Sequence, residues 1–186
     1  MRRFFIMAFA ATAIAAPAAA DEITDAIDGA LAAYKDGDIA YATEELNYAL
    51  QLLSEMKSET LAQFLPAAQD GWTREDDDGM AAGLGMVGGI VSAATYSDGR
   101  DDFTITLMAD HPMVASMGMI LANPAVMAGS GGKMVRVGRE KFMSRDGQLM
   151  ALIGNRVLVQ ADGDNEDAIV AHLKEMDLRA LAGFGS

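Results

Sequence analysis

The chain has 186 residues, no cysteine and a formal net charge of −13. A chain of this length can bury an apolar core within a single domain. Without cysteine it has no disulfides, no thiol nucleophile and no thiolate metal site. Its acidic charge repels the phosphate backbone of nucleic acids and the surface of anionic membranes, so we expect neither of them as a partner.

Residues 1–20 have the organisation of a cleavable secretory signal peptide. Arg2 and Arg3 come first, an apolar run follows, and Pro17 precedes three small alanines. The apolar run is too short to cross about 30 Å of hydrocarbon. We therefore expect cleavage near Ala20-Asp21, a periplasmic protein of 166 residues and no stable membrane insertion after cleavage.

Residues 21–65 predict a helical hairpin. Apolar residues recur at helical spacing on both sides of a Gly37-Asp38 turn, and Pro66 ends the pattern. Gly37 suits the positive φ that follows a helix end, and Asp38 suits the cap of the next helix. We expect Leu46 and Leu50 on the buried face of the second helix.

The stretch 30–42, followed by Ala49-Leu50, resembles one tetratricopeptide-type helical hairpin. Its small residues allow close helix contact, and Gly37-Asp38 makes the turn. A free-standing solenoid needs about three such units, and the chain has one. The hairpin must therefore bury its apolar face against the rest of the chain, a second copy or a protein partner.

Residues 66–186 predict a separate α+β domain. The runs 90–96 and 103–109, joined by a Ser-Asp-Gly turn, predict an antiparallel hairpin. Residues 112–122 and 165–176 predict helices. Four short strands complete the pattern, at Met134–Val137, Lys141–Ser144, Gln148–Ile153 and Arg156–Ala161. The expected fold class is α+β, with an N-terminal helical hairpin followed by an antiparallel sheet that carries helices on one face.

The order of these elements resembles the PsbP-like α/β sandwich. The resemblance rests on the Gly71-Trp72 entry, the strand–turn–strand unit, the helix at 112–122 and the late strand 155–159 before the last helix. It implies an accessory or ligand-binding role and no shared catalytic residues.

Two glycine- or acid-rich motifs invite cofactor interpretations that their surroundings do not support. Residues 83–88 match the string GxGxxG, but an acidic loop at 75–78 precedes them and a β-like segment follows, so we interpret 79–89 as a flexible loop or an apolar flap. The acidic run 162–167 lacks the glycine and the closing acid of a calcium loop, and predicts a turn with a helix cap. No cofactor is expected.

Methionine is unusually frequent, and seven of the 14 methionines lie between Met108 and Met143. Methionine fills irregular apolar gaps and lines adaptable binding surfaces. We therefore predict a groove between the helix at 112–122, the sheet and the 79–89 loop, which holds a small apolar ligand or a partner. Its surface is predicted to include Met86, Met108, Met113, Met117 and Met119.

The leading interpretation is a non-catalytic exported binding or accessory protein, and two alternatives stay open. His111, Met113 and Met117 lie close together and offer the soft ligands that select Cu(I), which would make the chain a periplasmic copper chaperone. A hydrolase that uses His111 or His172 is the second alternative, although no nucleophile motif accompanies either histidine. We expect His172 on the outer part of the last helix.

Overall fold

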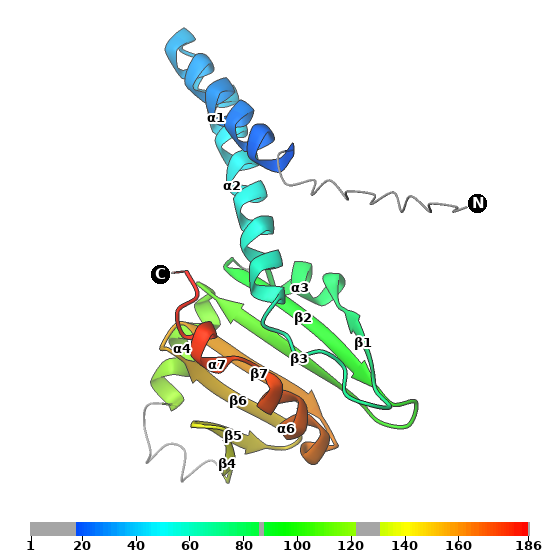
Figure 1. The fold of residues 1–186 in the computed structure, drawn as a ribbon. Coiled ribbons are helices and arrows are strands. Elements are labelled where there is room, and N and C mark those ends of the chain that lie inside the picture. The colour runs from blue at the N-terminus through cyan, green and yellow to red at the C-terminus, as the bar shows by residue number, and fades with distance from the viewer. Residues whose placement is uncertain (1–17, 86–87, 122–130, 186) are drawn as a thin grey trace, which may run out of the picture. The chain divides into compact units, whose positions relative to one another are not determined.

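The computed structural model describes residues 18–85, 88–121 and 131–185. These residues form an α+β fold, as predicted: two helices lead into a seven-stranded antiparallel sheet with further helices (Figure 1). The chain divides into two compact units, Met1–Leu53 and Ser54–Ser186. Among the described residues, no helix has the length and apolar character needed to cross a membrane.

The first unit is the helical hairpin. Helix α1 spans Ala18–Asp36, and α2 spans Ile39–Ala62, so α2 continues past the end of this unit. Gly37 has a φ of 84° at the turn, and the Asp38 carboxylate accepts a hydrogen bond from the Tyr41 amide. Both roles were predicted from the sequence. The residue that ends the first helix must tolerate a positive φ, and glycine does.

The expectation that Leu46 and Leu50 are buried is wrong. They are 50% and 63% exposed, and the helices meet through buried alanines instead. Small side chains let the two backbones approach closely, which turns the larger apolar residues outward. The buried alanines are Ala26, Ala30, Ala33, Ala42 and Ala49.

The second unit is built on one sheet with the strand order β1-β2-β3-β7-β6-β5-β4, in which all neighbours are antiparallel. Strand β7 therefore lies between two hairpin systems, next to β3 as well as β6. The strands are β1 Thr73–Asp76, β2 Ile90–Ser97, β3 Asp102–Ala109, β4 Lys133–Val137, β5 Glu140–Arg145, β6 Gln148–Ile153 and β7 Val157–Gly163.

Among the described residues, four helices accompany the sheet: α3 Asp78–Gly85, α4 Pro112–Leu121, α6 Glu166–Glu175 and α7 Leu178–Leu181. The predicted loop at 79–89 is wrong over its first part, which is helix α3. The Asp77 carboxylate accepts a hydrogen bond from the Met80 amide and so caps this helix. The predicted acidic loop at 75–78 instead contributes its first two residues to β1.

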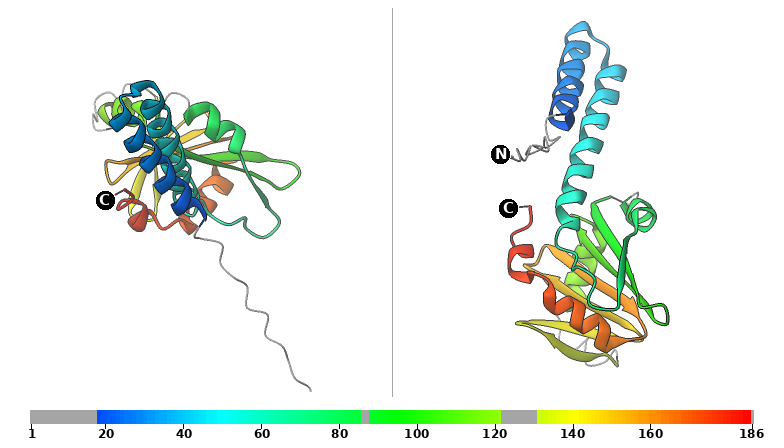
Figure 2. Two further views of the ribbon diagram at one scale, coloured as in Figure 1. Left: turned by 90° about the horizontal axis from the view of Figure 1, so that it is seen from above. Right: turned by 45° about the vertical axis from the view of Figure 1, so that its right-hand side comes forward.

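Alternate residues of the strands enter two different cores. The larger core contains Phe103, Ile105 and Leu107 of β3, and it is covered by the last turn of α2, by α6 and by α7. Met108 of β3 enters a smaller core with residues of α3 and α4. Figure 2 shows α6 and α7 on one side of the sheet and α3 and α4 on the other, whereas the sequence analysis expected helices on one face. The smaller core positions the candidate site.

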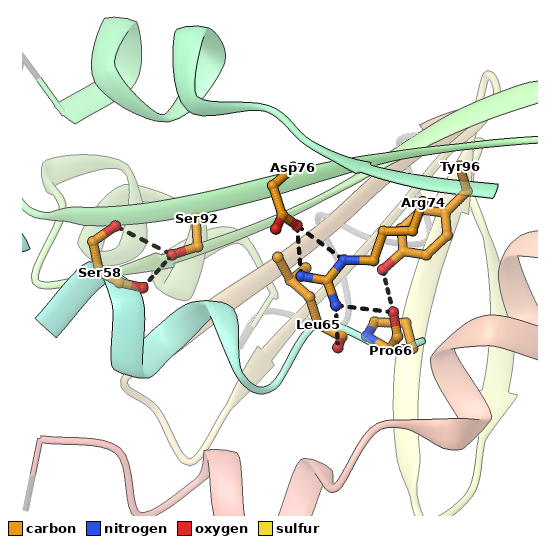
Figure 3. Close-up of polar contacts among 7 residues, drawn as sticks. All are labelled: Ser58, Leu65, Pro66, Arg74, Asp76, Ser92 and Tyr96. Carbon is orange, nitrogen blue, oxygen red and sulfur yellow. Dashed lines mark hydrogen bonds and ion pairs between the residues drawn. The ribbon is translucent and has the colours of Figure 1, made fainter. Parts of the chain in front are cut away.

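Polar contacts fix the end of α2 to the sheet (Figure 3). The Ser92 hydroxyl donates to the carbonyl oxygen of Ser58 at 2.7 Å. The Tyr96 hydroxyl donates to the Pro66 carbonyl at 2.6 Å, and burial raises the pKa of this phenol. Arg74 donates to the same carbonyl. These contacts explain why the end of α2 belongs to the second unit, which begins at Ser54. The change in composition along the sequence had instead predicted a domain boundary after residue 65.

His172 is fully buried, so the prediction that it lies on the outer part of its helix is wrong. Its ring lies about 5 Å, centroid to centroid, from the rings of Trp72, Tyr96 and Phe103. Nδ1 lies 2.9 Å from the carbonyl oxygen of Ala168 and Nε2 accepts from the Gln69 amide, so Nδ1 carries the proton and donates it. His172 therefore ties the 66–72 loop to α6.

Candidate functional site

The candidate site begins where β3 turns into α4. Asp110 has a φ of 53°, and Pro112 opens the helix, where its missing amide costs nothing. At Gly89, which has a φ of 95°, a Cβ would lie 2.6 Å from the Cα of His111. Only glycine fits this close approach, and it brings the start of β2 against the start of α4.

His111 joins α3 to α4. Its Nδ1 accepts a hydrogen bond from the Met113 amide at 3.1 Å, and its Nε2 lies 3.2 Å from the carbonyl oxygen of Leu84. Because Nδ1 accepts, Nε2 carries the proton and donates it. The ring is 5% exposed. His111 therefore uses both ring nitrogens to hold the framework of the site.

The smaller core fixes α4 on the sheet. Val114 packs with Val91, Met108 and Leu158, while Met117 and Leu152 pack against its edge. At Gly118, a Cβ would lie 3.1 Å from the side chain of Leu152, so a larger residue here would require that side chain to shift by a few tenths of an ångström.

A groove of about 720 Å³ runs along α4, beside Leu152 of β6 and the β6–β7 turn. Its walls combine apolar side chains of α4 and β6 with polar groups from the turns at either side. Arg156 is held in the β6–β7 turn, where its guanidinium donates to the carbonyl oxygen of Gly185 at 3.0 Å. The groove is lined by Asp110, His111, Pro112, Val114, Ala115, Gly118, Met119, Leu152, Asn155 and Arg156.

The predicted methionines do not share one environment. Met108 is buried in the smaller core, and Met117 is half-buried at its edge. Met113 and Met119 are 36% and 74% exposed, and of the four methionines that the structure describes only Met119 lines the groove. Met86 lies outside the described residues. The structure thus brings Met108 and Met117 together and places Met119 on a groove that α4 shares with Leu152 and the β6–β7 turn, whereas the sequence analysis placed the groove beside the 79–89 loop.

The proposed copper ligands give a constrained arrangement. Met113 and Met117 are one turn apart on α4, as the sequence indicates, but coordination by His111 would break one of its two backbone hydrogen bonds. Within the described part of the chain, no group of three or more His, Asp or Glu side chains could hold a metal ion. The copper chaperone stays an untested prediction.

The acidic run at 162–167 has structural roles. Asn165 caps α6 by accepting from the Ala168 amide, and Asp162 accepts from Gln148 and Gln160. The Ser144 hydroxyl donates to Glu166 at 2.6 Å, and with nearby Lys133 it holds the pKa of this carboxyl below its usual range. The predicted helix cap is confirmed, whereas Asp162 and Gly163 are the last residues of β7, where a turn was predicted.

Comparison of the chain with protein-family models, curated proteins and solved structures finds no match. The candidate function therefore rests on the geometry of the molecule itself. The resemblances to a tetratricopeptide hairpin and to the PsbP-like sandwich stay predictions.

Sequence reasoning missed one side of the groove. Leu152, Asn155 and Arg156 come from β6 and the following turn, which lie beside α4 only because β7 inserts between β3 and β6. One signal was present on α4 itself: Ala115 and Gly118, three residues apart, put small side chains on one face of an otherwise bulky helix.

Proposed function

We propose that this chain is a non-catalytic exported binding protein that holds a small amphipathic ligand in the groove along α4. The groove carries the proposal. Small-molecule sites are concave, mostly apolar and typically about 300–1,000 Å³ in volume, with a few polar groups that orient the ligand. A groove of about 720 Å³ with an apolar α4 wall has these properties.

The lining residues indicate the chemistry of the ligand. Val114, Gly118 and Leu152 offer apolar contacts for a hydrocarbon or ring system. Asn155 and Arg156 donate hydrogen bonds, and Arg156 adds a positive charge. A ligand with an apolar body and an anionic or hydrogen-bond-accepting head group matches both parts.

The environment of the two histidines supports binding over catalysis. General acid–base chemistry needs a ring nitrogen within reach of a substrate proton. In both histidines, each ring nitrogen lies within hydrogen-bonding distance of a backbone group of the fold. A hydrolase would have to release one of these bonds before it could act.

The test uses the anionic dye 1-anilinonaphthalene-8-sulfonate, which has an aromatic body and a charged head group. Ala115 is exposed and lines the groove, so Ala115→Trp fills the groove without entering the core. Ser116 is its exposed neighbour outside the lining, and Ser116→Trp is the matched control. We expect Ala115→Trp to weaken dye binding at least about tenfold, which corresponds to 1.4 kcal/mol.

Ser116→Trp should leave dye affinity within about twofold of the wild type. Circular dichroism of both variants checks that the fold is intact. A dye that does not bind the wild type, or that binds Ala115→Trp as tightly as Ser116→Trp, would overturn the proposal.

A further inference from the structure

The hairpin of the first unit has one apolar side and one polar side. Helical residues three, four or seven apart share a face, and this spacing places large apolar residues of α1 and α2 on the same side. We call this set the apolar hairpin face: Ile27, Leu31, Tyr34, Ile39, Leu46, Leu50 and Leu53. All seven side chains are between 42% and 65% exposed.

Contacts on the other side of the hairpin confirm this division. Tyr48 donates a hydrogen bond to the Glu22 carboxylate across the two helices. A Cβ at Gly29 would lie 3.5 Å from the Glu45 carboxylate, which marks a second approach between α1 and α2 on that side. These residues occupy helical positions across the alanine seam from the apolar hairpin face.

The alanine seam alone gives the hairpin little stability. Each buried alanine methyl removes only a small apolar area from water, and isolated helices are marginal in water without tertiary packing of an apolar face. An additional layer against the apolar hairpin face would supply the burial that the seam lacks.

The charge pattern distinguishes between possible occupants. Residues 21–53 contain eight acidic residues and one basic residue, Lys35. By helical position, none of the eight acids falls within the apolar hairpin face, and Asp28 comes nearest, at its edge. A cationic helix would find no carboxylate to pair with inside this face. A second copy would meet no like charge there, because the acids of both copies would point to solvent.

The size of the face also fits a second copy. Seven side chains of roughly 150–200 Å² each, about half exposed, present on the order of 600 Å² of surface, as large as the largest patches found on monomers. Two copies would bury about 1,200 Å², the lower end of the range for specific interfaces.

We propose that the apolar hairpin face binds the same face of a second copy, so that two hairpins form a four-helix bundle around a two-fold axis. Such an interface is isologous, with the same patch on both partners. Four helices enclose an apolar seam that two helices leave open. The inference concerns the hairpin and is independent of the groove along α4.

Sedimentation velocity over a range of protein concentrations tests the proposal. We expect a wild-type dimer that dissociates on dilution. The double variant Leu46→Gln/Leu50→Gln should raise its dissociation constant at least about a hundredfold, because four leucines leave the interface. Tyr41→Gln is the matched control, since Tyr41 is 48% exposed on the other side of α2, and it should leave the constant within about threefold. Higher salt should strengthen the dimer by screening the acidic residues.

Single cysteines give a second readout, because the chain has none of its own. Under mild oxidation, Leu31→Cys, Leu46→Cys and Leu50→Cys are compared with Tyr41→Cys. Residues near a two-fold axis meet their own counterparts within the 7 Å that a disulfide requires between Cα atoms. At least one of the three should form a covalent dimer, and Tyr41→Cys should not.

Three outcomes would overturn the proposal. One is a wild type that remains monomeric at about 100 µM, which would leave the face to a different partner. Another is a dimer that the double glutamine variant does not weaken. The third is equal cross-linking through Tyr41→Cys, which would place the interface elsewhere on the hairpin.

Discussion

Met113 and Met117 are one helical turn apart, yet their surroundings differ. Met113 is partly exposed, whereas Met117 packs at the edge of the smaller core. Their spacing predicted a shared face, but not which side of that face the sheet would cover. The strand methionines show the same limit: the register aligns Met134, Met143 and Met150 in one row across β4, β5 and β6. The clustering of methionines in the sequence thus partly reflects side chains that are neighbours on the sheet.

The copper alternative makes a prediction at the scale of these residues. We expect the purified protein to take up no stoichiometric Cu(I) in competition with a strong chelator, because both ring nitrogens of His111 are held by the backbone. Met113→Leu/Met117→Leu removes the sulfurs while nearly keeping the volume, and each change should cost under about 1.5 kcal/mol.

The two proteins should therefore behave alike in the competition assay. Tight binding of one Cu(I) by the wild type, lost in the double leucine variant, would exchange the leading function for the copper chaperone.

At the scale of elements, the strands with clear alternation were predictable, and α3 was not. The run that became β3 alternates Phe103, Ile105 and Leu107 with threonines, and glycine marks its turn with β2, so local pattern and fold agree. Helix α3 contains three glycines, which disfavour a helix by about 1 kcal/mol each. It forms because Asp77 caps it and because Ala81 and Leu84 pack on the smaller core.

Local sequence patterns also could not predict that β7 would insert between β3 and β6. Strand order depends on contacts between residues far apart in the chain, such as Leu107 with Val159. For the same reason, the α4 side of the groove was predicted and the β6 side was not.

The anchored end of α2 yields a prediction about this element. Tyr96→Phe should destabilise the second unit by about 1 kcal/mol, because it removes one hydrogen bond to Pro66 while the ring keeps its packing. Urea unfolding followed by tryptophan fluorescence measures the change. Tyr41→Phe, at an exposed residue of the same type, should change the free energy of unfolding by less than about 0.3 kcal/mol. Equal midpoints for wild type and Tyr96→Phe would show that Arg74 alone holds this carbonyl.

The whole molecule joins a unit with two extensive apolar cores to a hairpin whose helices meet through alanines. The described residues of both cores begin at Leu61, so the second unit contains all of its own core. The composition indicated two parts, but it did not indicate that α2 would belong to both of them. A continuous helical pattern in the sequence does not show which tertiary contacts each turn of the helix will make.

This asymmetry predicts that unfolding is not a single transition. Trp72 is the only tryptophan and lies 5.1 Å from Phe103, centroid to centroid, so its fluorescence reports on the second unit. Circular dichroism at 222 nm reports on the helices of both units. We expect the dichroism signal to fall in urea before the fluorescence changes, because a hairpin with an alanine seam has less apolar burial to lose.

The early phase should also depend on protein concentration if the hairpins pair, because mass action stabilises a dimer as its concentration rises. Leu46→Gln/Leu50→Gln should remove that dependence and move the early phase to lower urea concentration. The free energy of unfolding that Trp72 reports should stay within about 0.3 kcal/mol of the wild type. Coincident transitions at every concentration would show that the two units unfold as one, so that the hairpin draws its stability from contacts with the rest of the same chain rather than from a second copy.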